Sequence, residues 1–270
     1  MSSLIFQKIM HPPNSSPVTS PPSGPTPQYR KTTLEHASSV KEILVAVKDV
    51  VQILQRLAAD HQILHKHIDY NNVAIRREQL PGAGSCEGVV LDLDFPDSRD
   101  GSSASNNPVT FMGSYAFSSV RKLGRIKSGT PVAGTRLRVG DDFESVLYVL
   151  CWACYGYDHN ARPDKFRPDW LRKWAERGTA SNAYYAKTGF LENDDDDAGI
   201  RTHVNRYMGC DRDILEEVIE KLREGAESAR TETEGAYNRM LEIIQGGIER
   251  VQKERCGKSV CCSGVSSASD

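Results

Sequence analysis

Two short apolar segments of the chain each carry polar side chains that could hold a metal ion and a phosphate group. The first, ILHKHIDYNNVAI, runs from Ile63 to Ile75, and the second, VVLDLDF, runs from Val89 to Phe95. Asn72 lies in the first segment and Asp92 in the second. Carboxylate and amide oxygens carried on paired short strands are suited to hold Mg²⁺ beside a phosphate. The two segments together predict a metal–phosphate site.

The order of the polar residues in these segments resembles eukaryotic protein kinases, and more closely the divergent fungal-type protein kinase family. In that pattern a His-Arg-Asp triplet is followed, five residues after its Asp, by an Asn, and an Asp-Phe-Gly or Asp-Phe-Asp triplet comes later. Here the segment His65–His67 lies at the first triplet, and Asn72 lies five residues after His67. The segment Asp92–Asp94 lies at the second triplet.

The resemblance implies a chemical role for each of these positions. In a protein kinase the Asp of the first triplet orients the substrate hydroxyl, while the Asn and the later Asp hold the metal ions that bridge the phosphates of ATP. Asn72 and Asp92 are therefore the expected metal ligands, and ATP and Mg²⁺ are the cofactors of a competent site. His67, however, stands where the family has its catalytic Asp. Loss of one proton-transfer group typically lowers a rate by ~10²–10⁴.

Two residues remain as substitutes for the lost carboxylate. His67 could accept a proton, since an unperturbed imidazole titrates near pH ~6.5, but its cation would repel Mg²⁺. Asp69 could supply a carboxylate, although its negative charge beside the transferred phosphate is unfavourable. His61, His65 and His67 could instead bind a metal, but no Cys or carboxylate spacing completes a zinc site. His65 resembles the structural His that packs beneath the loop in the family.

Later segments extend the resemblance. GSYAFSSVR, from Gly113 to Arg121, is similar to the element that closes the activation segment of the family. Arg121 replaces a Glu that pairs with a late Arg there, so we do not expect the usual ion pair. The run Asp142–Ser145 resembles the start of a long apolar helix, and Asp142 resembles the buried Asp that accepts hydrogen bonds from the catalytic loop. The segment Leu171–Glu192 is similar to the next helix of the family with its Trp and Lys.

Residue periodicity predicts the elements that position these side chains. Apolar residues recur at helical spacing from Leu34 to about Ile63, which predicts a long helix before the catalytic loop. Strands at Val73–Ile75 and Val89–Leu93, separated by Pro and Gly, predict a β hairpin. We therefore expect a mainly α fold with a small β hairpin, like a protein kinase C-lobe. Further helices are expected from near Asp142, from Trp170 to Arg177, from Asp211 to about Gly225 and from about Glu232 to Lys253.

The resemblance also predicts how the chain is divided. It begins near residue 34, and the preceding residues 1–33 are Pro- and Ser-rich, which predicts a disordered extension. A phosphate-cradling loop needs several glycines, but only Gly24 precedes Gly82. We therefore expect no recognisable N-lobe, a C-lobe over residues 34–255, and a disordered tail over residues 256–270.

The composition favours some classes of protein and argues against others. A chain with 39% hydrophobic and 26% charged residues is ordinary for a globular protein, and its net charge of −2 gives no reason to expect a nucleic-acid partner. No apolar run reaches membrane-spanning length and no signal peptide is recognised, so we expect a cytoplasmic or nuclear protein. Of the seven cysteines, expected to be reduced, Cys151 and Cys154 lie in an apolar run that favours core packing over redox chemistry.

Three hypotheses for the function follow. The first is a truncated fungal-type pseudokinase that acts as a binding or regulatory module for a protein partner. The second is an active protein kinase that transfers the γ-phosphate of ATP to Ser or Thr of a protein substrate, with His67 or Asp69 as the base. The third is a helical adaptor, unrelated to phosphotransfer, that binds a partner through its last two helices. Whether the chain is an enzyme is left open by the sequence.

Overall fold

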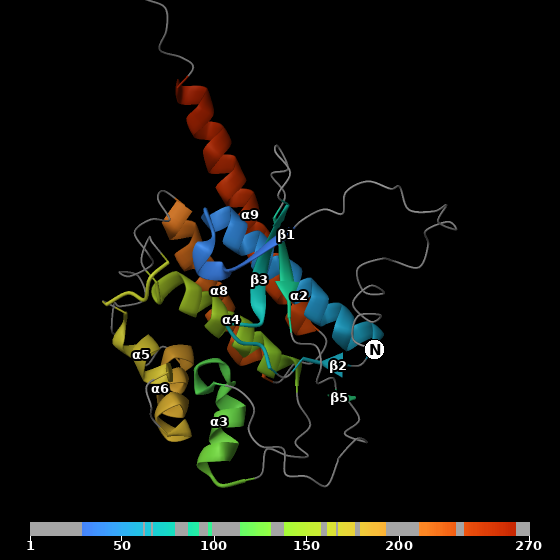
Figure 1. Cartoon of the computed structure of the whole chain (residues 1–270), viewed down its shortest axis with the longest axis vertical. Helices are drawn as coiled ribbons and strands as arrows, with labels where there is room; N and C mark the ends of the chain where they lie inside the picture. The colour runs from blue at the N-terminus through green and yellow to red at the C-terminus, as the bar shows by residue number, and fades with distance from the viewer. Residues whose placement is uncertain are drawn as a thin grey trace, which may run out of the picture.

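The computed structural model describes residues 29–61, 63–65, 67–78, 86–91, 97–98, 114–130, 138–157, 161–165, 167–175, 179–192, 211–230 and 235–262. Within these residues the structure has seven α-helices and a small amount of β-structure, most of which lies beside α2 (Figure 1). The helices are α2 (Val40–Asp60), α3 (Val120–Lys127), α4 (Val139–Tyr155), α5 (Asp169–Ala175), α6 (Ala180–Glu192), α8 (Arg212–Ala229) and α9 (Gly235–Cys262).

The β-structure consists of two small antiparallel sheets. The strands β1 (Tyr29–Thr33), β3 (Val73–Glu78) and β4 (Cys86–Val90) form one sheet in the order β1-β3-β4. The short strands β2 (Ile63–Leu64) and β5 (Asp97–Ser98) form the other. The expected hairpin is present as β3–β4, and the mainly α, kinase-like C-lobe architecture is confirmed.

Strand β1 and the end of α9 lie at the edges of the expected C-lobe. Residues 29–33, which the sequence analysis included in a disordered extension, form β1 and pair with β3, with Thr33 opposite Ala74. The backbone of α9 continues to Cys262, past the expected boundary at residue 256. Residues 1–28 lie outside the described residues.

Helix α2 starts later than the sequence periodicity predicts. Leu34–His36 form a separate 3₁₀ turn, η1, and α2 begins after Ser39, whose side chain accepts a hydrogen bond of 3.2 Å from the backbone nitrogen of Glu42. A Ser side chain at this position satisfies a backbone donor that the helix itself leaves unpaired. The apolar face of α2 then packs into the core from Val40 to Ala58.

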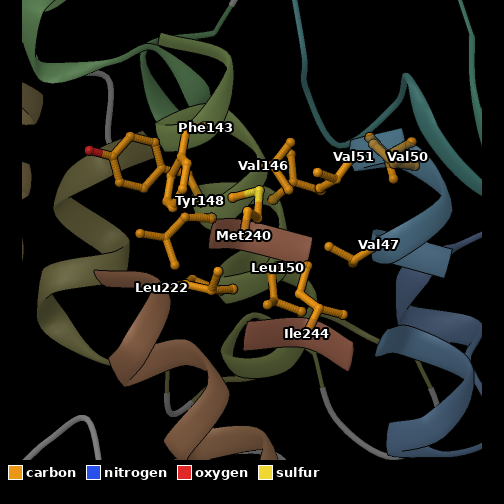
Figure 2. Packing of buried hydrophobic residues seen from close by; sticks show 14 of the residues in the cluster. Val47, Val50, Val51, Phe143, Val146, Tyr148, Leu150, Leu222, Met240 and Ile244 are labelled. Atoms are coloured by element: carbon orange, nitrogen blue, oxygen red, sulfur yellow. The ribbon is translucent and has the colours of Figure 1, made fainter. Parts of the chain in front are cut away.

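Helix α4 lies at the centre of the protein. All of its residues except Trp152 are buried, as expected for a helix that is covered on every side. Cys151 and Cys154 are free thiols in this helix, fully buried, so the prediction that they are core residues is confirmed. In Figure 2 the side chains of α4 meet those of α2, α8 and α9, among them Val47, Val50, Phe143, Val146, Leu150, Leu222, Met240 and Ile244.

Two glycines allow the elements around α2 to approach closely. A Cβ atom on Gly88 of β4 would lie 1.9 Å from the carbonyl oxygen of Ala46, so the hairpin rests directly on α2. A Cβ atom on Gly247 of α9 would lie 2.5 Å from Val218 of α8. The β3–β4 hairpin is thereby held at a fixed distance from the core.

Among the described residues, no helix combines the length and apolar character needed to span a membrane.

Candidate functional site

The segment between β2 and β3, residues 65–72, forms the loop expected to be catalytic. Its first residue, His65, is buried, and the backbone nitrogen of His65 donates a hydrogen bond of 3.3 Å to Oδ2 of Asp142. The same carboxylate oxygen lies 3.4 Å from the hydroxyl of Tyr237 on α9, which donates to it. Asp142, at the start of α4, is only 2% exposed. The loop is therefore attached to the central helix through one buried carboxylate.

A second set of hydrogen bonds attaches the loop to the end of β4. The Nε2 atom of His65 lies 3.1 Å from the carbonyl oxygen of Leu91, and the backbone nitrogen of Leu91 donates to the carbonyl oxygen of Asn72 at 2.8 Å. Leu91 directly precedes Asp92, the expected second metal ligand, which lies outside the described residues. The structure thus places Asn72 beside the residue that leads to Asp92.

The centre of the loop is closed by contacts among its own residues. One carboxylate oxygen of Asp69, Oδ1, accepts hydrogen bonds from the backbone nitrogens of Asn71 (2.7 Å) and Asn72 (3.1 Å). The other, Oδ2, lies 3.1 Å from Nε2 of His67. The side-chain nitrogen of Asn72 donates to the carbonyl oxygen of His67 at 2.8 Å. Asp69 therefore stabilises the turn in the way that Asp side chains commonly do, through backbone N–H groups two and three residues ahead.

The weaker alternative of the sequence analysis, a metal site built from histidines, is not supported by these contacts. His65 is directed to Leu91 and His67 to Asp69, while His61 is exposed at the end of α2. Within the part of the chain that the structure describes, no three His, Cys, Asp or Glu side chains form a group that could hold a metal ion.

Tyr70 connects the loop to two distant parts of the chain. Its ring stacks on that of Tyr157, with centroids 5.5 Å apart and an interplanar angle of 13°. Burial, together with hydrogen bonds to Glu35 and Tyr157, raises the pKa of Tyr70 well above its ordinary value, so the phenol stays protonated. Sequence reasoning missed this residue because its partners are far away along the chain.

The segment 114–121 lies against the N-terminal end of α4. The Ser119 hydroxyl donates to Oδ1 of Asp141 at 2.6 Å, and the Arg121 guanidinium forms an ion pair with the same carboxylate. Asp141 also accepts a hydrogen bond of 3.0 Å from the backbone nitrogen of Arg138, the N-cap residue of α4 three positions before it. Arg121 thus has an acidic partner on α4, in a different arrangement from the Glu–Arg pair of the family.

Glu144 and Lys187 fix the same segment from the other side. Oε2 of buried Glu144 accepts hydrogen bonds from the backbone nitrogen of Val120 and the hydroxyl of Tyr148, both at 2.8 Å, and its Oε1 lies 3.1 Å from Nε of Arg230. Lys187 of α6 is fully buried, and its Nζ donates to the carbonyl oxygens of Tyr115 (2.9 Å) and Ser118 (2.7 Å). Burial lowers the pKa of Lys187 well below its ordinary value.

These elements and contacts lie largely within one stretch of the chain that matches a protein family model. A family model described as fungal protein kinase matches residues 30–154. This stretch belongs to the fungal protein kinase family. The match runs from β1 to near the end of α4 and includes the loop, Leu91 and Asp142. No curated protein matches the chain.

Within the fungal protein kinase segment, the structure brings together five of the six predicted site residues, the sixth being Asp92, which lies outside the described residues. His65, His67, Asp69 and Asn72 share one loop, and Asp142 is bonded to its first residue. Sequence reasoning singled out neither Glu144 nor Lys187, although the runs Asp142–Ser145 and Leu171–Glu192 contain them. A charged residue inside an apolar helical pattern could have identified both residues. Such a residue is expected to be buried, and a buried charged side chain requires a partner.

Proposed function

We propose that this protein is a kinase-like module without phosphoryl transfer activity, a pseudokinase that binds a protein partner. The observation that carries the proposal is the closed loop around His67. The position of the catalytic Asp holds an imidazole that contacts Asp69, and both carboxylate oxygens of Asp69 are already engaged. The loop keeps its shape without presenting a carboxylate to a substrate.

Asp69 is a poor substitute for the missing base because of what its release would leave behind. To reach a substrate hydroxyl, its carboxylate would have to leave the backbone nitrogens of Asn71 and Asn72. Losing these two hydrogen bonds would cost about 0.5–1.5 kcal/mol each, although the Asn72 nitrogen would keep the carbonyl oxygen of Asp69 as an acceptor at 3.1 Å. Proton transfer through Asp69 would therefore begin from a loop that has lost its side-chain hydrogen bonds.

The residues at the metal positions fit a nucleotide site only in part. The side-chain nitrogen of Asn72 is bonded to His67, so its amide oxygen is the atom that would face a metal ion, with Asp92 as the second ligand. Bound Mg²⁺ would neutralise charge on the phosphates of ATP.

The proposal includes a cytoplasmic or nuclear location, which the free thiols of Cys86, Cys151 and Cys154 support.

The first experiment is thermal unfolding of the whole chain with and without Mg-ATP, compared with the Asp92→Ala variant. A ligand at 100 times its dissociation constant stabilises a protein by about 2.7 kcal/mol. We expect no metal-dependent shift in either protein. A rise in unfolding temperature with Mg-ATP that disappears in Asp92→Ala would show that the chain binds nucleotide at this site. It would contradict an entirely structural role for the loop.

A phosphotransfer assay with labelled ATP decides between the pseudokinase and the active-kinase alternative. We expect no incorporation of label into the chain or into a general protein substrate such as casein. Incorporation that is lost in Asp69→Asn would make Asp69 the base and the chain a Ser/Thr kinase. His67→Asn serves as the matched variant, because it removes the other candidate base and leaves the hydrogen bonds from Asn71 and Asn72 to Asp69 in place.

A further inference from the structure

The charged side chains of the protein are unevenly distributed along the chain. Residues 101–140 contain six of its 34 Lys and Arg residues and none of its 36 Asp and Glu residues, which leaves 28 cationic against 36 acidic residues elsewhere. Four of these six lie on one short helix, α3, as Arg121, Lys122, Arg125 and Lys127. The sequence therefore has a local excess of cationic residues although the net charge of the protein is −2, and one of these residues, Arg121, is paired with Asp141.

Helix α3 packs against α6 in a small cluster separate from the main core. Leu123 of α3 lies with Ala180 and Ala183 of α6, and the ring of Tyr184 packs over Gly124, where a Cβ atom would approach the ring to 3.1 Å. This contact places the aromatic side chains of α6 beside the last turn of α3. Figure 1 shows the two helices side by side.

Lys127 lies over two tyrosine rings at this junction. Its Nζ is 4.6 Å from the ring centroid of Tyr184 and 4.0 Å from that of Tyr185. Tyr185 is 60% exposed, and among the described residues it is the one large hydrophobic side chain that is exposed. Residues 128–130, which follow α3, are exposed as well. We call Lys127, Tyr184, Tyr185 and residues 128–130 the α3–α6 surface.

We propose that the α3–α6 surface binds an acidic peptide segment of a protein partner. The ammonium group of Lys127 would pair with a carboxylate of the peptide, and the exposed ring of Tyr185 would pack against its apolar atoms. Tyrosine provides a large contact area with few rotatable bonds, and for this reason it is enriched at protein interfaces. The two rings also restrict the Lys127 side chain, which reduces the entropy that binding would remove.

The charge distribution favours a peptide over a nucleic acid or an anionic membrane. Nucleic-acid-binding domains usually carry an extended basic surface and a high isoelectric point, whereas this chain has a pI near 6.4. Beyond the screening length of about 8 Å at physiological salt, charges elsewhere on the protein contribute little. A short acidic segment can therefore contact the cationic region alone, while a long polyanion would also meet the acidic remainder.

This inference goes beyond the proposed function by naming a surface and the chemistry of its partner. The catalytic loop takes no part in it. Because the binding experiment contains no nucleotide, failure of the acidic-peptide proposal and failure of the pseudokinase proposal are recognised separately.

The test is a fluorescence anisotropy titration of the whole chain with a labelled Glu-rich peptide and with the same peptide carrying Gln in place of Glu. We expect the Glu-rich peptide to bind, and we expect its affinity to fall about five- to tenfold in Lys127→Glu. The affinity should also fall at high salt, as is usual for charged contacts at the exposed edge of an interface. The matched control is Lys253→Glu. It changes the net charge equally at an exposed position of α9 and should leave binding unchanged.

Several outcomes would overturn the proposal. Equal binding of the two peptides, or equal loss in Lys127→Glu and Lys253→Glu, would show that the α3–α6 surface is not the site. Tighter binding of single-stranded DNA or of phosphatidylserine vesicles, with the same dependence on Lys127, would assign the surface to another class of partner. If Lys127→Glu unfolds at a lower temperature than the original chain, Tyr185→Ala provides a second test of the same surface. The proposal requires that Tyr185→Ala also weakens binding of the Glu-rich peptide.

Discussion

Two adjacent carboxylates at the start of α4 anchor two different regions of this protein. Asp142 accepts a hydrogen bond from the backbone of His65, at the start of the loop, and one from Tyr237. Asp141 accepts hydrogen bonds from Ser119 and from the backbone of Arg138, and pairs with Arg121. The first turn of α4 therefore holds the loop through a hydrogen bond to Asp142. It holds the segment 114–121 through an ion pair and a hydrogen bond to Asp141.

The loop and the segment 114–121 are held by different kinds of contact. His67 stands at the position that the sequence analysis assigned to the catalytic Asp of the family, and the shape of the loop is held by hydrogen bonds that involve mostly backbone atoms. The segment 114–121 is fixed by buried ionic side chains from two helices, Asp141 and Glu144 of α4 and Lys187 of α6. The loop therefore depends more on backbone hydrogen bonds, and the segment 114–121 more on buried charged side chains.

The largest effect on this comparison is expected from Glu144→Ala. The substitution leaves the Val120 nitrogen, the Tyr148 hydroxyl and part of the Arg230 guanidinium without an acceptor in a buried place. We expect the free energy of unfolding, measured by urea denaturation, to fall by about 3 kcal/mol or more.

The matched control for this variant is Glu224→Ala, an exposed glutamate on α8. A surface substitution of this kind changes stability by no more than about 0.5 kcal/mol. If the two variants were equally stable, the charged side chains behind the segment 114–121 would contribute nothing, and the contrast with the loop would disappear.

Much of the helical framework could be predicted from the sequence, because its pattern is local. The apolar spacing indicated α2, α8 and α9, and the Pro- and Gly-containing turn indicated the β3–β4 hairpin. Helix α3 was missed because it is short and buries only Val120 and Leu123, too few residues for a periodic signal. Strand β1 was missed because its stability depends on pairing with β3, more than forty residues away.

The candidate site was predictable in its spacing but not in its contacts. Motif order placed His67 and Asn72 in one loop, since residues five apart in a tight loop must lie close together. The engagement of Asp69 with His67, by contrast, depends on which way each side chain turns. The roles of Tyr70 and Lys187 depend on partners brought together by the whole fold, which spacing along the chain cannot reveal.

A pair of variants at the start of α4 would sharpen the comparison between the two regions. Asp141→Ala removes the partner of Arg121 and Ser119, and Asp142→Ala removes the acceptor of the His65 nitrogen. Each should lower the free energy of unfolding by about 1–3 kcal/mol.

Hydrogen exchange distinguishes these two variants by location. Asp141→Ala should speed amide exchange in residues 114–121 and leave the loop protected, while Asp142→Ala should do the opposite. Faster exchange in both regions with either variant would mean that the turn acts as one unit, and that the loop is not held independently of the segment 114–121.

The smallest expected effect is a pH dependence of the free energy of unfolding that arises from Lys187, which contacts the segment 114–121. Burial lowers the pKa of Lys187 below its ordinary value of 10.5 in the folded protein. Between the lowered pKa and 10.5 the unfolded chain binds more protons at this residue than the folded one, so stability rises with pH in that window. Lys187→Met removes this contribution, which amounts to at most about 1.4 kcal/mol per pH unit.

Urea denaturation at about pH 7 and about pH 9 measures this contribution as the difference in slope between the original chain and Lys187→Met. Lys173→Met, at an exposed position of α5, should retain the original slope. Equal slopes in all three proteins would mean that the ammonium group of Lys187 stays protonated throughout, stabilised by the carbonyl oxygens of Tyr115 and Ser118 and by the ring of Tyr148, 3.8 Å away. In that case the segment 114–121 would be held by a permanent cation, and its stability would be as independent of pH in this range as we expect that of the loop to be.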